Sequence, residues 1–124
     1  MALSIAASSR FSYKMAVETD LEADPKVNIF GGGVTLYSIE FDNTNNGSQV
    51  VYLKLYDSSS TITAGTSAPD YQFRAAGGAR IMIQLPTGIE FKNGLSFLCS
   101  TTAGTAGDIT TDPTSAVLVN LVVA

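Results

Sequence analysis

Acidic residues at regular spacing are the first candidates for chemistry in this chain. Glu18, Asp20, Glu22 and Asp24 follow one another at every second position. Hard metal ions such as calcium take several oxygen ligands, so a cation site is one interpretation of this run. In an extended chain, however, these carboxylates share one side and repel, and no glycine turn folds them around an ion. We expect a solvated acidic face or a patch that docks on a basic partner, and no metal or other cofactor.

Groups that could catalyse a reaction are sparse. The sequence contains no histidine, so proton transfer would depend on carboxylates, lysine or tyrosine. Glu40 and Asp42 share one face of a predicted strand and come nearest to an acid–base pair, and we interpret them as a solvent-facing surface. Cys99 is the single cysteine and lies in an apolar alternation, which predicts a buried thiol that behaves as a small hydrophobe. The sequence therefore predicts no enzyme.

Length and charge narrow the class of protein. A chain of 124 residues is one domain with a real core, and a single cysteine excludes an internal disulfide framework. Eleven acidic residues against seven scattered basic ones argue against a nucleic-acid partner. The most apolar stretch, 116–124, is far shorter than the ~20 residues of a membrane span. Because the N-terminus lacks the pattern of a signal peptide, we expect a protein made and used without export, with no membrane partner.

The strongest strand pattern lies at 49–57, Gln-Val-Val-Tyr-Leu-Lys-Leu-Tyr-Asp. Its apolar residues at period two predict a central strand with one buried face. The opposite face carries Tyr52, Lys54 and Tyr56, whose amphipathic side chains suit a half-wet surface. Tyr52 and Tyr56 are therefore candidates for contact with a partner.

Alternating patterns predict strands in further segments, separated by clusters of turn-forming residues. These segments are 11–17, 34–42, 70–75, 80–85, 89–91, 95–100 and 116–124. We expect Pro86 to end one of them. The turn formers at 42–48 predict a hairpin. The last segment is apolar on both faces, which predicts a strand that is central or covered by another chain. About eight short antiparallel strands predict an all-β fold, a β-sandwich or jelly roll.

Residues 1–33 look different from the rest and predict an extended N-terminal arm, followed by a β-sandwich domain over 34–124. In the arm, Phe11, Tyr13, Met15 and Val17 alternate with other residues, as in a strand with one buried face. The glycines at 31–33 form a break between arm and body; they lack the Gly-Lys-Ser/Thr ending of a phosphate loop. An extended segment behind such a hinge can add a strand to a neighbour's sheet. We therefore place partner contacts at these four residues.

Four motifs in the body carry a family resemblance. They are Leu36-Tyr-Ser-Ile-Glu-Phe-Asp-Asn43, Val51-Tyr-Leu-Lys-Leu-Tyr-Asp57, the loop Gly65-Thr66 with Pro69, and Pro86-Thr-Gly-Ile-Glu-Phe-Lys-Asn-Gly-Leu-Ser96. In their order and spacing they resemble a family of small phage virion proteins. The resemblance covers roughly residues 34–123 and leaves the expected arm outside it.

The resemblance implies a β-sandwich subunit of a virion, assembled in the host cytoplasm. The leading expectation is a homo-oligomeric capsid decoration or cement protein whose partners are the major capsid protein and copies of itself. The alternative is a tail or fibre accessory module that binds host-surface glycans, with Tyr52, Tyr56 and Tyr71 as stacking candidates. The absence of tryptophan, a frequent sugar platform, counts against that alternative. The resemblance brings no catalytic residues.

Overall fold

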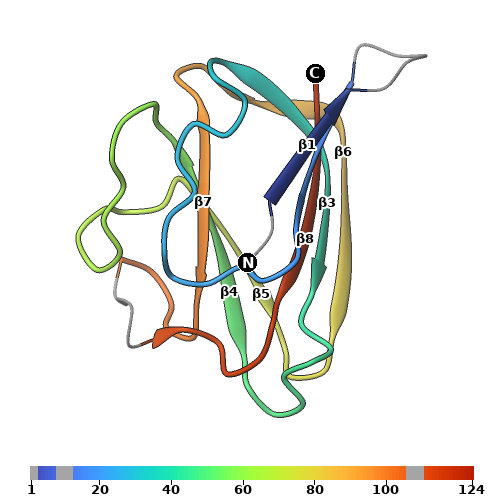
Figure 1. The fold of residues 1–124 in the computed structure, drawn as a ribbon, viewed down its shortest axis with the longest axis vertical. Coiled ribbons are helices and arrows are strands. Elements are labelled where there is room, and N and C mark those ends of the chain that lie inside the picture. The colour runs from blue at the N-terminus through green and yellow to red at the C-terminus, as the bar shows by residue number, and fades with distance from the viewer. Residues whose placement is uncertain (1–2, 8–12, 106–110) are drawn as a thin grey trace.

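Two antiparallel sheets packed face to face make up the protein (Figure 1). The computed structural model describes residues 3–7, 13–105 and 111–124, which form eight strands and no α-helix. The strands are β1 (Leu3–Ala7), β2 (Lys14–Glu18), β3 (Val34–Asp42), β4 (Val51–Asp57), β5 (Tyr71–Ala75), β6 (Arg80–Phe91), β7 (Leu95–Ser100) and β8 (Leu118–Val123). The wide sheet has the order β1-β2-β8-β3-β6, and the narrow sheet has the order β5-β4-β7. The predicted all-β sandwich is confirmed.

The core lies between the sheets and is built from the inward side of each alternating strand. Its largest fully buried apolar side chains include Phe41, Phe91 and Phe97. Removing such a ring from water contributes about 1.5–3 kcal/mol. β4 lies between β5 and β7, and β8 lies between β2 and β3. The strand at 49–57 is therefore central, as predicted. Of the two alternatives for the last strand, central or covered by another chain, the structure shows the central place.

Strand β6 is longer than the sequence indicated, because it continues through Pro86. The two predicted segments 80–85 and 89–91 form one strand. Ser38 pairs with Gln84, and the next paired residues are Leu36 and Ile89, so the register shifts at a bulge. Pro86 lies between these pairs on an edge strand, where its missing N–H removes no bond from the ladder.

The turn clusters connect strands of different sheets. The segment 43–50 leads from β3 to β4, 76–79 from β5 to β6, and 92–94 from β6 to β7, and each pair of strands is divided between the two sheets. The predicted hairpin at 42–48 is therefore wrong. Turn residues set the local reversal of the chain, but the flanking strands separate because each buries its own apolar face against the opposite wall of the core.

The described part of the expected arm forms part of the sandwich. β2 is hydrogen-bonded along its length to β8. After β2 the chain crosses to the narrow sheet, where the backbone of Lys26 exchanges hydrogen bonds of 2.8 and 2.9 Å with that of Phe97. Leu21 and Ala23 are buried in this crossing. The segment 19–30 thus closes the free edge of β7. Its apolar residues Leu21 and Ala23 alternate with acidic residues in the sequence, and they belong to the core.

The outer face of the narrow sheet is covered by the chain's own loops. Ile62, from the loop between β4 and β5, packs on Tyr56 and Leu98. Lys54 is also buried, and this burial lowers the pKa of its ammonium group. The prediction of a half-wet face was therefore wrong for Lys54 and Tyr56, whereas Tyr52 is half-buried. The loop at 58–69 is rich in hydroxyl residues and poor in apolar ones, so the sequence did not indicate that it covers the narrow sheet.

Two buried asparagines hold three connections together at one end of the sandwich. Asn43 Nδ2 donates to the carbonyl oxygens of Gln49 and Ala76, at 2.8 and 3.1 Å. Asn46 Nδ2 donates to Asn43 Oδ1 at 2.9 Å and to the carbonyl of Ser115 at 3.0 Å, and Asn46 Oδ1 accepts from the Ser115 N–H at 2.8 Å. Buried polar groups that are satisfied in this way fix one loop arrangement.

Asn46→Ala is expected to destabilise the fold by about 1–3 kcal/mol, because it leaves the part-buried backbone groups of Ser115 and the buried Asn43 Oδ1 without these partners. Urea unfolding followed by circular dichroism measures the loss. Asn45→Ala is the matched control, since Asn45 is exposed and makes one bond of 3.1 Å to Ala116. Equal losses for the two variants would contradict a structural role for the buried network.

Candidate functional site: the outer face of the wide sheet

The side of the wide sheet that points away from the core is the candidate site, and we call it the outer face. Two rows of side chains cross four of its strands from β2 to β6. The ladder pairings give the rows as Met15, Val122, Ser38, Gln84 and Val17, Asn120, Glu40, Met82. Their ladder neighbours, such as Ala16, Ile39 and Leu121, are buried on the core side. Alternation along the strands therefore presents both rows outward.

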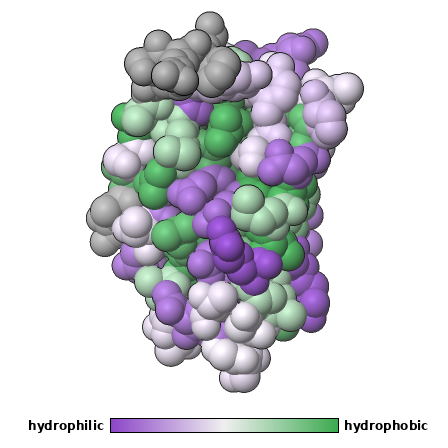
Figure 2. All heavy atoms as spheres, turned by 90° about the vertical axis from the view of Figure 1, so that its right-hand side faces the viewer, coloured by the Kyte–Doolittle hydropathy of each residue, from purple (hydrophilic) through white to green (hydrophobic). Residues whose placement is uncertain are grey.

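Apolar side chains on this face remain open to solvent. Met82 is 54% exposed and Met15 is 42% exposed. Figure 2 looks at this side of the molecule and shows hydrophobic atoms on both sides of a central polar band. Methionine is flexible and polarisable, and it is over-used on surfaces that bind other proteins. Exposed apolar groups around a polar centre are typical of a protein interaction surface.

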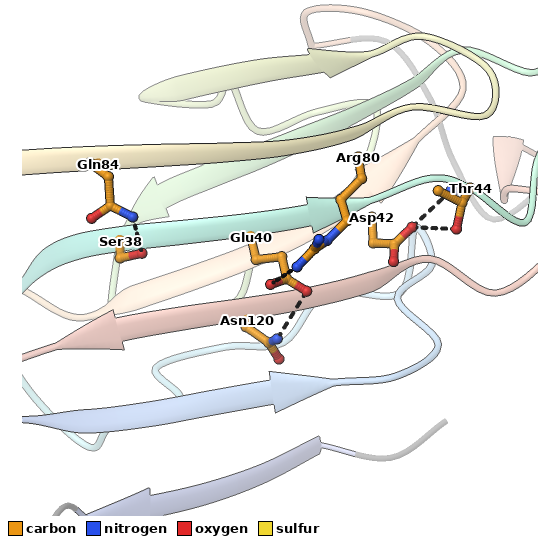
Figure 3. Close-up of polar contacts among 7 residues, drawn as sticks. All are labelled: Ser38, Glu40, Asp42, Thr44, Arg80, Gln84 and Asn120. Carbon is orange, nitrogen blue, oxygen red and sulfur yellow. Dashed lines mark hydrogen bonds and ion pairs between the residues drawn. The ribbon is translucent and has the colours of Figure 1, made fainter.

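The polar band is held by contacts between strands (Figure 3). Arg80 Nη2 donates to Glu40 Oε2 at 2.7 Å, and Asn120 Nδ2 lies 3.4 Å from Glu40 Oε1. Glu40 therefore bridges β6 and β8 across its own strand, β3. The Gln84 amide lies 3.4 Å from the Ser38 hydroxyl in the next row. Because the charges are paired within the face, a partner would meet a surface of low net charge.

The two carboxylates that came nearest to an acid–base pair do not act on each other. Glu40 is engaged by Arg80, whereas Asp42 Oδ1 accepts hydrogen bonds from the hydroxyl and N–H of Thr44 at 2.6 and 2.9 Å. These bonds to Thr44 hold the pKa of Asp42 below its usual value. The pair is therefore part of the polar band, as the sequence predicted for a solvent-facing surface.

A groove opens at the end of the outer face where β3 bulges. It has a volume of about 430 Å³ and is lined by Tyr13, Tyr37, Ser38, Gln84, Leu85, Pro86 and Val122. The rings of Tyr13 and Tyr37 meet edge to face, with centroids 5.9 Å apart. Gly88 makes room for this arrangement, because a Cβ there would lie 2.9 Å from the Tyr37 ring. The groove combines aromatic surface with a hydroxyl and an amide.

The structure brings together part of the predicted contact set. Met15 and Val17 lie on the outer face, and Tyr13, just before β2, lines the groove. Phe11 lies outside the described residues. The predicted buried face of this strand was wrong, because Ala16 and Glu18 point inward and Met15 is exposed.

The predicted stacking tyrosines do not form one surface. Tyr56 is buried under a loop, and Tyr52 is half-buried on the other side of the molecule. Tyr71 lies opposite Leu55 on the core-facing side of the narrow sheet and packs against Phe91 with ring centroids 5.8 Å apart. Tyr37 and Met82 were not among the predicted contact residues. The alternation of Ile81, Ile83 and Leu85 with Met82 could have placed Met82 outside the core, whereas Tyr37 has the same parity as the buried Ile39 and Phe41, and only the bulge in β3 turns it outward.

The acidic run is not one solvated face. Glu18 is buried, and its Oε2 accepts the Asp20 N–H at 3.0 Å. Asp24 is exposed and pairs with Lys26 at 3.5 Å, while Glu22 approaches Asp112. The carboxylates point differently because the strand ends at Glu18. Among the described residues, no group of three or more acidic or cysteine side chains is arranged to hold a metal ion.

Cys99 is fully buried, as predicted. Its Sγ donates to the carbonyl oxygen of Leu21 at 3.0 Å. Burial raises the pKa of the thiol well above its ordinary value, and nearby carboxylates such as Asp112 add to this effect. The neutral thiol is the form that the fold favours.

Glu22→Gln is expected to raise the stability of the fold at neutral pH. Partial burial and the carboxylates of Asp112 and Asp20 raise the pKa of Glu22 above its ordinary value of 4.5. The folded chain therefore holds this proton more tightly than the unfolded chain, so stability falls as the pH rises from the ordinary pKa through the raised one. Thermal unfolding should show equal Tm values near pH 4 and a higher Tm for the variant at about pH 7.

Asp24→Asn is the control for this measurement. Asp24 is exposed and its ion pair with Lys26 is a surface pair, which contributes about 0–1 kcal/mol at most. If Glu22→Gln gave no gain at neutral pH over this control, the crowding of Glu22 by Asp112 would be disproved.

Comparison of the chain with protein-family models, with curated proteins and with solved structures finds no match. None of the described segments forms a helix with the length and apolar character needed to cross a membrane. The resemblance of residues 34–123 to phage virion proteins therefore stays a prediction from the sequence motifs.

Proposed function

We propose that this protein is a structural subunit of a virus particle, a capsid decoration or cement protein that docks through its outer face and reinforces contacts between coat subunits. The observation that carries the proposal is the difference between the two outer faces of the sandwich. Loops cover the narrow sheet, whereas in the described part of the chain no segment crosses over the outer face of the wide sheet (Figure 1).

The chemistry of the outer face suits a lattice contact. Met15, Val17 and Val122 offer apolar area on one side of the polar band, and Met82 offers it on the other. Between these two apolar areas, the charges of Glu40 and Arg80 neutralise each other. A surface of this kind binds by burying apolar area, with paired polar groups that set register. Many copies on a symmetric shell would multiply a modest contact by avidity.

Met82→Lys is expected to reduce binding to particles about tenfold or more, because it places a charged ammonium group in the apolar part of the contact. The measurement is co-sedimentation with particles of the encoding virus, prepared without this chain and then mixed with purified protein. Wild-type protein should reach a fixed number of copies per particle. Met82 is exposed and lies opposite Glu40 in the ladder, so the introduced ammonium group stays in water and the variant should still fold.

Val27→Lys is the matched control, because Val27 is also an exposed apolar residue but lies in the crossing segment. It should bind particles like the wild type. The proposal is overturned if mass spectrometry finds no copies of the chain in purified wild-type particles. Docking through the outer face is overturned if Met82→Lys and Met15→Lys both bind at wild-type occupancy.

The groove at Tyr13 and Tyr37 favours a second candidate function, a tail or fibre module that binds host-surface glycans. Its volume of about 430 Å³ is in the usual range for small ligands. Aromatic faces beside a hydroxyl and an amide can contact both the apolar and polar sides of a sugar ring. This candidate moves the sugar site from Tyr52, Tyr56 and Tyr71 to the bulge of β3.

Tyr37→Ala tests the glycan function. If the groove binds sugars, a glycan array should show reproducible binding by the wild type, reduced about tenfold by the variant through loss of aromatic contact. Tyr52→Ala, on the opposite side of the sandwich, should leave the signal unchanged. The absence of reproducible wild-type binding, or equal effects of the two variants, would remove this candidate.

A further inference from the structure

Strand β1 forms an edge of the wide sheet that lacks the usual protection. It is hydrogen-bonded to β2 on one side, and no strand of the described residues lies along its other side. Its sequence, Leu-Ser-Ile-Ala-Ala, contains neither a charge nor a proline. Soluble proteins guard free edges with such residues or with bulges. The opposite edge strand, β6, has both Pro86 and a bulge, so β1 is the unguarded edge.

The inner side of β1 is also open among the described residues. Leu3 lies opposite Glu18 and Ile5 opposite Ala16, and these partners are buried, so Leu3 and Ile5 point to the inner side of the wide sheet. The narrow sheet has three strands against five, and β1 extends beyond its cover. Leu3 therefore stays 36% exposed and Ile5 44% exposed, although they point inward. An apolar, uncharged edge is thus accessible for pairing.

We propose that β1 pairs with β1 of a second copy of this chain, antiparallel and around a two-fold axis at Ile5, which joins the wide sheets of two molecules into one continuous sheet. A second copy fits because the edge is neutral and so does not repel itself. The pairing is isologous: each copy offers the same five residues and accepts the same five in return.

The charges next to β1 favour the antiparallel orientation. Glu18 flanks Leu3 at one end of the strand, and Lys14 flanks Ala7 at the other. A two-fold axis at Ile5 sets Leu3 opposite Ala7 of the second copy. The Glu18 end of each molecule then faces the Lys14 end of the other, whereas parallel pairing would bring like charges together. The separation across the two intervening strands is about three strand spacings, roughly 14 Å, so this attraction steers more than it binds.

The paired molecules would present their outer faces side by side and in the same direction, because the axis is perpendicular to the joined sheet. Five-residue strands bury a small area, which makes the pair weak in solution and strong only where many copies are held together. The consequence for assembly rests on the proposed function: a dimer would dock with two outer faces at once. The pairing itself does not depend on that role.

Disulfide trapping tests the register directly. Across the proposed axis Ile5 faces Ile5 at about 4.5–5.5 Å between Cα atoms, a distance that a disulfide spans. Ser4 faces Ala6, so the two Ser4 residues lie on a diagonal of about 7–8 Å, too far for an unstrained bond. Ile5→Cys should therefore form covalent dimers with diamide much faster than Ser4→Cys. The buried Cys99 makes the introduced thiol the reactive one.

Charge complementation tests the same axis without a cross-link. Ile5→Lys and Ile5→Glu each place like charges directly opposite each other, so each variant alone should dissociate at least about tenfold more readily than wild type in sedimentation velocity. An equimolar mixture of the two should associate again. Val27→Lys is the control and should self-associate like the wild type. Circular dichroism confirms that each variant is folded.

The outcomes separate this inference from the proposed function. A wild-type chain that remains monomeric at high concentration, or equal cross-linking of Ile5→Cys and Ser4→Cys, overturns the β1 pairing whatever the particle experiments show. Self-association that survives Ile5→Lys also overturns it, because another surface would then be responsible. Met82→Lys should lose particle binding while it keeps the β1 dimer, so failure of the virion role leaves the dimer measurement valid.

Discussion

Apolar burial between two sheets of unequal width is the constraint on which the rest of this structure depends. A three-stranded sheet cannot cover a five-stranded one. Most residues of the shared core come from β3 and β8 of the wide sheet and from β4 and β7 of the narrow one, and the strands at the rim depend on other cover. The crossing segment 19–30 supplies it on one side by adding Leu21 and Ala23 to the core and by closing the edge of β7. Among the described residues, none gives β1 such cover.

The polar interior follows from the same arrangement. Because the chain crosses repeatedly from one sheet to the other, several connections meet at one end, and their backbone groups are removed from water. Asn43 and Asn46 satisfy these groups with side-chain amides that donate and accept at once. A buried amide without these partners would cost about 1–3 kcal/mol. Asn43 and Asn46 therefore stabilise the fold, although a cluster of asparagines in a turn could also be interpreted as a binding loop.

Three surfaces of the sandwich differ in their cover. Loops of the chain cover the outer side of the narrow sheet, whereas the described residues leave the outer face of the wide sheet and the edge of β1 open. Ile62 and its loop make the outer side of the narrow sheet a second, smaller core. The outer face of the wide sheet keeps Met15 and Met82 exposed around an internally paired Glu40–Arg80. The edge of β1 exposes backbone groups beside Ile5. Interaction through the open surfaces requires no catalytic group.

The sequence by itself determined the all-β class, the positions of most strands, the central place of β4 and the buried Cys99, because side-chain alternation and turn chemistry are local. The predicted number of strands, about eight, matches the structure partly because two errors cancel. The sequence prediction missed β1, and it divided β6 into two strands at Pro86. Only the tertiary structure decided that turns cross between sheets, that Ala16, Leu21 and Ala23 of the expected arm are buried in the core, and that Lys54 and Tyr56 are covered while Met15 and Met82 are not. These outcomes depend on which face a distant segment covers, and alternation within one strand carries no information about that segment.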